Sequence, residues 1–230
     1  MNTQEFSYEF DILWNNIMSN QAPGLSEYEK SVFLTQAQEV IVKGIYNGTL
    51  TEPFESTEEA RSFLTPLVEE YTFNNALTTG NHIVSNSKLY DLSIINPKPW
   101  FIIYEWVEFT NNVNCDNNVG IVKPVTHDTF YDINRNPFKK SNERRVLRLT
   151  YHDSKDIAEL VSEYSIKTYK LRYIKKPEPI ILEDLQNGDT IDGETLEKNC
   201  KLNDNLHRVI LEMAVKLAQQ AWVLTRQTKE

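Results

Sequence analysis

Hydrophobic residues in the N-terminal third of the chain recur at the spacing of one helical face. The pattern predicts helices over residues 3–20, 26–48 and 56–71, the last with a break at Pro66. The apolar stripes of the first two helices are Phe6, Phe10, Leu13, Trp14, Ile17 and Met18, and Phe33, Ala37, Val40, Ile41 and Ile45. The expected caps are Thr3, the capping boxes Ser26–Glu29 and Ser56–Glu59, and Gly48 as the C-terminal stop of the second helix.

From about residue 75 the period changes to that of short strands separated by Asn, Asp, Pro and Gly residues. The expected strands are 82–84, 89–95, 100–109, 120–125, 146–151, 157–161 and 166–174. The run at 100–109, WFIIYEWVEF, is apolar on both faces, which indicates the centre of a sheet or a surface covered by another subunit. In the run at 166–174 apolar and polar side chains alternate, which predicts that one face of this strand is exposed to solvent. The Asn-rich segment 111–120 predicts an exposed loop.

The C-terminal segment returns to helical spacing. Its stripe consists of Leu206, Val209, Ile210, Met213, Ala214, Leu217, Ala221 and Leu224, and Asn203 or Asp204 can cap it. This order predicts an α+β fold, in which three N-terminal helices and one long C-terminal helix form a small helical bundle. The expected domains are residues 1–75 plus 196–230 for the bundle, and residues 76–195 for a large β-rich insertion between the third and fourth helices.

Composition is that of a folded protein, with 40% hydrophobic and 25% charged residues in a chain of 230. The net charge of −9 disfavours sequence-specific DNA binding, because an acidic chain repels phosphates. The two cysteines, Cys115 and Cys200, share no motif and predict free thiols in a reducing compartment. No apolar stretch is long enough to cross a membrane, and the N-terminus lacks the pattern of a secretory signal.

Catalytic and cofactor motifs are absent from the sequence, which has no glycine-rich phosphate loop, HExxH or CxxC, so no cofactor and no enzyme activity are expected. One alternative is a metal-dependent nuclease or hydrolase, in which His127, Asp128 and Asp132 hold a divalent ion that activates water. The competing interpretation is a turn, in which Asp128 accepts hydrogen bonds from backbone N–H groups and His127 packs at a strand end. We favour the turn.

Two groups of residues are candidates for contact with a partner. The first is the segment 139–148, KKSNERRVLR, the only dense basic segment of the sequence. The second is a set of aromatic residues in the strand predicted at 100–109. The candidate residues are Lys139, Lys140, Arg144, Arg145, Arg148, Trp100, Tyr104 and Trp106. A protein contact is favoured over DNA, because the chain is acidic and the basic segment carries no aromatic residues for base stacking. For the basic segment the alternative is a solvent-exposed edge of a hairpin. For the aromatic residues it is the core of the sheet.

Five segments, in this order, resemble the connector ring proteins of crAss-like and related tailed phages of Bacteroidales. They are SEYEKSVFLTQAQEVIVKGIYNG at 26–48, FESTEEARSFLTPLV at 54–68, VTHDTFYDINRNPFKK at 125–140, YIKKPEPIIL at 173–182 and TIDGETLEKNCKLNDNLHRVILEMAVKLA at 190–218. They are spread over residues 26–218, which is most of the length of the chain, and none of them carries catalytic residues.

The resemblance implies a virion structural protein, made in the host cytoplasm, that forms a ring of the head-to-tail connector beneath the portal. Its expected partners are about twelve copies of itself, the portal, neighbouring connector or tail rings and the passing double-stranded DNA, with no membrane. The ring in direct contact with the portal is favoured, and a head-completion or tail-tube protein is the alternative. Acidic residues would line a channel in which DNA slides, with Glu59, Glu69, Glu70, Glu183 and Asp184 as candidates.

Overall fold

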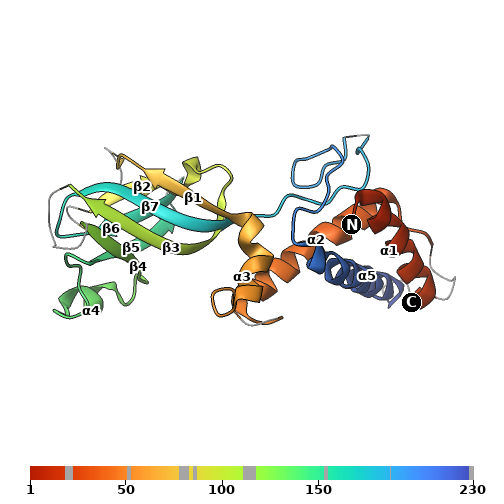
Figure 1. Cartoon of the computed structure of the whole chain (residues 1–230), viewed down its shortest axis with the longest axis horizontal. Coiled ribbons are helices and arrows are strands. Elements are labelled where there is room, and N and C mark those ends of the chain that lie inside the picture. Colours follow the sequence, from red (N-terminus) through yellow and green to blue (C-terminus); the bar gives the residue numbers. More distant parts are fainter. Residues whose placement is uncertain are drawn as a thin grey trace. The chain divides into compact units, whose positions relative to one another are not determined.

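The computed structural model describes residues 1–18, 23–50, 53–77, 83–84, 87–110, 118–152, 155–186 and 188–227, and the statements below concern these residues. The helices are α1 (Thr3–Met18), α2 (Glu27–Asn47), α3 (Glu58–Leu64), α4 (Phe130–Arg135) and α5 (Asp204–Gln227), with 3-10 turns at Thr65–Leu67 and Leu92–Ile94. The strands are β1 (Val68–Phe73), β2 (Lys88–Asp91), β3 (Pro99–Phe109), β4 (Val119–Pro124), β5 (Arg145–His152), β6 (Asp156–Val161) and β7 (Ile166–Lys175). The mixed α+β class is therefore confirmed (Figure 1).

The chain separates into two compact units. The helical unit comprises Met1–Leu67 and Pro177–Glu230, and the sheet unit comprises Val68–Lys176. The sheet unit is thus inserted into the sequence of the helical unit. The finer domain boundaries expected from the sequence, at residues 76 and 195, stay a prediction.

In the helical unit the packing is concentrated among α1, α2 and α5 (Figure 1). The buried face of α5 includes Ile210 and Ala214, which are fully enclosed, and on α2 Ala37 and Ile41 are buried in the same way. The two alanines among them, Ala37 and Ala214, are small and let the helices approach closely. The predicted four-helix arrangement is not confirmed.

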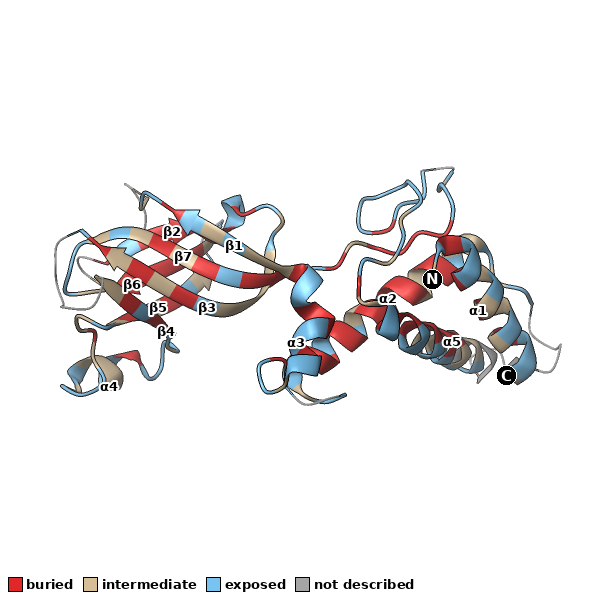
Figure 2. Cartoon of the chain, viewed as in Figure 1, coloured by how far each residue is buried: buried red, intermediate tan, exposed pale blue. Residues whose placement is uncertain are grey.

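Three residues of the expected helical stripes are exposed: Val40 on α2, and Val209 and Ala221 on α5. Val40 on α2 is 43% exposed and Val209 on α5 is 45% exposed. The buried faces of both helices are rotated relative to the predicted stripes, since Leu34 and Val42 on α2 and Leu211 on α5 are enclosed instead. Figure 2 shows exposed positions along the outer side of each helix. The shift occurs because each helix carries more apolar positions than one packed face can hold.

The caps of α2 agree with the sequence prediction. The Ser26 hydroxyl accepts a hydrogen bond from Glu29 N, and the Glu29 carboxylate accepts one from Ser26 N. Gly48 ends the helix at φ 71° and ψ 29°, a left-handed conformation that glycine adopts without strain.

The caps of α1 and α3 lie one residue away from the predicted positions. Asn2 caps α1 by accepting a hydrogen bond from Glu5 N at 2.8 Å, whereas the hydroxyl of Thr3 donates to Glu197. Thr57 caps α3 by accepting from Ala60 N at 3.1 Å, so the expected Ser56–Glu59 capping box does not form. In each case a neighbouring side chain of the same capping class takes the position.

A polar row on α2 holds the segment that follows β7. The Thr35 hydroxyl accepts from Ile180 N at 3.1 Å, the Ser31 hydroxyl accepts from Leu182 N at 3.0 Å, and the Gln38 amide donates to Glu178 O at 2.8 Å. These polar groups lie one helical turn apart, as the backbone of an extended segment laid along a helix requires. Buried backbone groups of residues 178–182 thus find partners without a sheet.

Residues 68–71, predicted as a continuation of the third helix, form part of β1 instead. The helix ends at Leu64, a 3-10 turn contains Pro66, and β1 then pairs antiparallel with β7, with Val68 opposite Ile174. The helical prediction was wrong because the decisive partner strand is far away in the sequence, and tertiary pairing overrides a local pattern.

The seven strands form one sheet in the order β1-β7-β3-β4-β5-β6-β2, antiparallel except for the β4–β5 pair. The strands expected at 100–109, 120–125, 146–151, 157–161 and 166–174 are confirmed within one residue at either end. The run 89–95 is a strand only to Asp91, and 83–84 belong to a bend. The loop expected at 111–120 and the start of the run 82–84 lie largely outside the described residues.

The sheet curls around its own core (Figure 2). Phe73 on β1 and Tyr90 on β2, from the two ends of the strand order, place their rings 5.5 Å apart, and both contact Tyr169 of β7. The predicted alternation of β7 is confirmed, because Tyr169 and Leu171 are buried and Arg172 is exposed. On the outer face of the sheet, α4 packs Phe130 with buried residues of β5 and β6, a short helix that the sequence analysis missed.

Candidate partner-contact surface

An aromatic strip lies on the outer face of β3, which occupies the interior of the strand order between β7 and β4. Tyr104 and Trp106 point away from the core that Val107 and Phe109 enter, and their rings lie 5.5 Å apart. Trp106 is opposite Ile121 of β4, and the guanidinium of Arg172 lies 5.9 Å from the Trp106 ring centre. We call Tyr104, Trp106 and Ile121 the β3 strip. With Tyr104 46% and Ile121 39% exposed, it offers solvent an apolar surface beside a cation.

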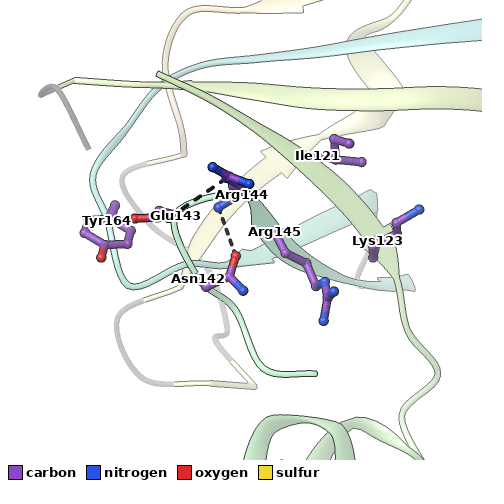
Figure 3. A pocket seen from close by; sticks show the side chains of 7 residues that line it. All are labelled: Ile121, Lys123, Asn142, Glu143, Arg144, Arg145 and Tyr164. Carbon is purple, nitrogen blue, oxygen red and sulfur yellow. Dashed lines mark hydrogen bonds and ion pairs between the residues drawn. The ribbon is translucent and has the colours of Figure 1, made fainter. Parts of the chain in front are cut away.

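A basic pocket adjoins the β3 strip through Ile121 (Figure 3). It is lined by Ile121 and Lys123 of β4, by the turn Asn142–Arg145 that precedes β5, and by Tyr164. The Asn142 side chain accepts a hydrogen bond from Arg144 N at 2.9 Å, which fixes the turn. The predicted partner-contact residues Arg144 and Arg145 therefore lie together with Lys123, a cation that the sequence analysis did not single out.

The other predicted residues do not all join this pocket. Lys139 is exposed, and Lys140 pairs with Glu163 at 2.7 Å. The Trp100 ring lies beside the tilted ring of Phe101, with ring centres 4.8 Å apart. Arg148 is only 11% exposed and turns toward the carboxylate of Glu105. The basic segment is thus divided between the protein surface and the sheet interior.

The interior of the sheet holds a buried polar cluster. Glu105, 4% exposed, lies 3.1 Å from Arg148 Nε and accepts a hydrogen bond from the Tyr169 hydroxyl. Burial raises the pKa of Glu105, an effect that the Arg148 charge and the Tyr169 hydrogen bond partly offset. Burial, together with the Glu105 carboxylate, raises the pKa of Tyr169 well above its usual value. The Tyr169 hydroxyl is therefore neutral and donates a hydrogen bond. The cluster links the side chains of β3, β5 and β7 inside the sheet.

Of the three residues of the metal alternative, His127 and Asp128 lie in a turn. His127 Nε2 lies 3.0 Å from Thr150 O, and the exposed Asp128 carboxylate has its pKa lowered by a hydrogen bond from Thr126, helped by backbone N–H groups. Asp132 belongs to α4. Within the described residues no group of three His, Cys, Asp or Glu side chains could hold a metal ion. The geometry thus gives the metal alternative no support.

Two surface features escaped the sequence analysis. One is a groove of about 530 Å³ between α1 and α5, which we call the α1–α5 groove; it is lined by Tyr8, Glu9, Ile12, Leu13, Arg208, Leu211 and Glu212. The other is Phe138, 88% exposed, in the turn 136–140, which we call the Phe138 loop. The spacing of Tyr8 and Ile12, beside the buried stripe of α1, was a signal for the groove; a single exposed Phe gives none.

No helix in the described ranges is both long enough and apolar enough to traverse a lipid bilayer.

Comparison with known proteins assigns this chain to a family. The chain is 40% identical to "Ring protein 3" of Bacteroides phage crAss001 over 224 residues, which is 95% of each protein. It is 34% identical to "Ring protein 4/5" of the same phage over 240 aligned positions, covering 96% of this chain and 94% of the relative. The family described as phage tail ring protein 3/4 matches residues 1–230. The chain therefore belongs to the phage tail ring protein 3/4 family and is related to the ring proteins of a crAss-like phage.

Proposed function

We propose that this protein is a non-enzymatic structural component of a phage virion, in which its copies form a closed ring of the head-to-tail connector. The observation that carries the proposal is the family match over residues 1–230, supported by two relatives named as ring proteins. The β3 strip and its adjacent cations add a physical argument, because an exposed apolar surface beside charge suits a protein interface.

Neighbouring rings are the second class of partner in this proposal. Two ring proteins of one phage resemble this chain over nearly its full length. Rings of similar subunits stacked on one another would explain why one virion needs several such proteins. A count of about twelve copies and direct contact with the portal follow from the family resemblance alone and stay predictions.

The acidic character of the chain suits a wall around passing DNA, since carboxylates repel phosphates and prevent sticking. The structure divides the candidate residues. Glu69 and Glu70 pair with Lys175 and Arg172, which neutralises them. Glu59 and Glu183 are exposed and, within the described residues, have no ion-pair partner, so they are the better candidates for a channel wall.

Electron microscopy and native mass spectrometry of the chain, purified alone and with the connector proteins of its phage, test the proposal. Closed rings of uniform copy number are expected. A chain that remains monomeric with every connector protein would refute it. Incubation of a plasmid with the protein and Mg²⁺ or Mn²⁺ is expected to leave the DNA intact, and cleavage lost in His127→Ala would instead favour the metal alternative.

A further inference from the structure

A subunit that closes into a ring of more than two copies must carry two different surfaces that fit each other, because each copy contacts one neighbour with one surface and the next neighbour with the other. On this chain the Phe138 loop and the α1–α5 groove are two surfaces that could fit each other in this way, an assignment that rests on the proposed ring.

The Phe138 loop presents a large apolar side chain on a fixed backbone. Phe138 N donates to the Asn136 side chain at 2.9 Å, and Phe138 O accepts from Arg145 Nη1 at 2.9 Å. Lys139 N and Lys140 N both donate to Asn136 O, at 3.0 and 2.9 Å. Because the backbone of the loop is already fixed, binding costs only the rotamer freedom of the Phe138 side chain, which favours an interface anchor.

The loop is also positively charged. Lys139, directly after Phe138, is exposed and has no ion-pair partner within the described residues. A partner surface for this loop must therefore combine an apolar floor with a carboxylate at its edge.

The α1–α5 groove has this combination. Tyr8 and Ile12 supply the exposed apolar surface, at 69% and 42% exposed, and Leu13 and the enclosed Leu211 complete the apolar lining. Its charged lining consists of two carboxylates, Glu9 and Glu212, and one cation, Arg208, so its net charge is negative; neither carboxylate has an ion-pair partner in the described part of the chain. Its volume of about 530 Å³ lies in the range of cavities that accept small organic groups.

We propose that the Phe138 loop of one copy inserts into the α1–α5 groove of the neighbouring copy in the ring, with the Phe138 ring on the apolar floor and Lys139 beside Glu9 or Glu212. The contact joins the sheet unit of one subunit to the helical unit of the next. Repeated around the ring, it uses every loop and every groove once.

Disulfide trapping tests this directional contact in the full-length chain. Both natural cysteines are replaced by serine, and Lys139→Cys and Glu9→Cys are introduced together, so that the Phe138 ring and its apolar floor stay in place. Mild oxidation of assembled rings is expected to give a ladder of trimers and longer species on a non-reducing gel. Each single variant cannot exceed a dimer, and mixing the two single variants gives heterodimers.

Phe138→Ala provides an independent measurement, with Ile94→Ala as its control, because Ile94 is also an exposed apolar residue of the sheet unit, at 56%. Phe138→Ala is expected to raise the protein concentration needed for half-assembly about tenfold or more, and Ile94→Ala to leave it unchanged. Rings that form normally with Phe138→Ala and give no ladder would overturn this contact while the ring function stands. A chain without rings in any mixture would overturn both.

Discussion

Replacing Arg148 with Met is predicted to destabilise the sheet unit strongly at neutral pH. The substitution keeps most of the side-chain volume and removes the cation 3.1 Å from Glu105, whose carboxylate is 4% exposed. Breaking a buried pair by removing one partner costs about 3–5 kcal/mol, because the remaining charge is left without compensation. Glu105 keeps its hydrogen bond from Tyr169, so we expect the lower end of this range, about 3 kcal/mol.

The cost is predicted to shrink in acid. Burial raises the folded-state pKa of Glu105, and loss of the Arg148 charge raises it further. An acid with a raised folded-state pKa stabilises the fold when it is protonated, and this stabilisation is lost as the pH rises through that pKa. The Arg148→Met protein should therefore recover part of its stability as the pH falls from about 7 toward about 5.

Urea titration followed by hydrogen-exchange mass spectrometry measures this effect in each unit separately. Peptides from β3 and β7 report the sheet unit, and peptides from α2 and α5 serve as an internal reference. The matched control is Arg144→Met, which removes an arginine that is 71% exposed and should change stability by less than about 0.5 kcal/mol. In the double variant Glu105→Gln/Arg148→Met part of the loss should be restored, because both charges are gone and the Gln carbonyl oxygen keeps an acceptor for the Tyr169 hydroxyl.

Two results would refute this reasoning. Equal effects of Arg148→Met and Arg144→Met would mean that the buried pair contributes no more than a surface charge. A loss that stays constant across the pH range would mean that Glu105 does not carry the penalty.

Three further substitutions test other parts of the fold. Glu159→Gln should speed hydrogen exchange at residues 83–84 and cost about 1–3 kcal/mol, because the buried carboxylate accepts from both backbone N–H groups there; unchanged exchange would contradict this. Thr35→Val should cost about 1–3 kcal/mol in urea unfolding by leaving Ile180 N unpaired, whereas the exposed Gln36→Ala should be neutral. Gly48→Ala should lower the melting temperature, since Gly48 has φ 71° and an added Cβ would lie 2.7 Å from Pro53; an unchanged value would rule out this strain.

The strands and long helices were accessible from the sequence because their signals are local. Turn residues bracket the runs that became β3 to β7, and a capping box with a terminal glycine marks α2. β1 was not accessible, since Glu69 and Glu70 after Pro66 resemble a helix turn until β7 supplies the pairing partner. Which of several apolar stripes a helix buries also depends on the neighbouring helix, as the exposure of Val40 shows.

The candidate surface was accessible only in part. Arg144 and Arg148 look equivalent in a basic segment, yet strand alternation and a distant carboxylate turn Arg148 inward. The aromatic residues Tyr104 and Trp106 do lie together on the outer face of β3. The groove beside Ile12 required α5, which joins α1 from the other end of the chain.

The discontinuous helical unit sets an order of events during synthesis on the ribosome. The sheet unit is complete once Lys176 has emerged, but α1 and α2 must wait for α5, whose buried face forms part of their core. The α1–α5 groove does not exist before Leu211 and Glu212 are in place. A nascent chain can therefore display its Phe138 loop but offers no site to receive one, which would delay polymerisation until translation is nearly finished.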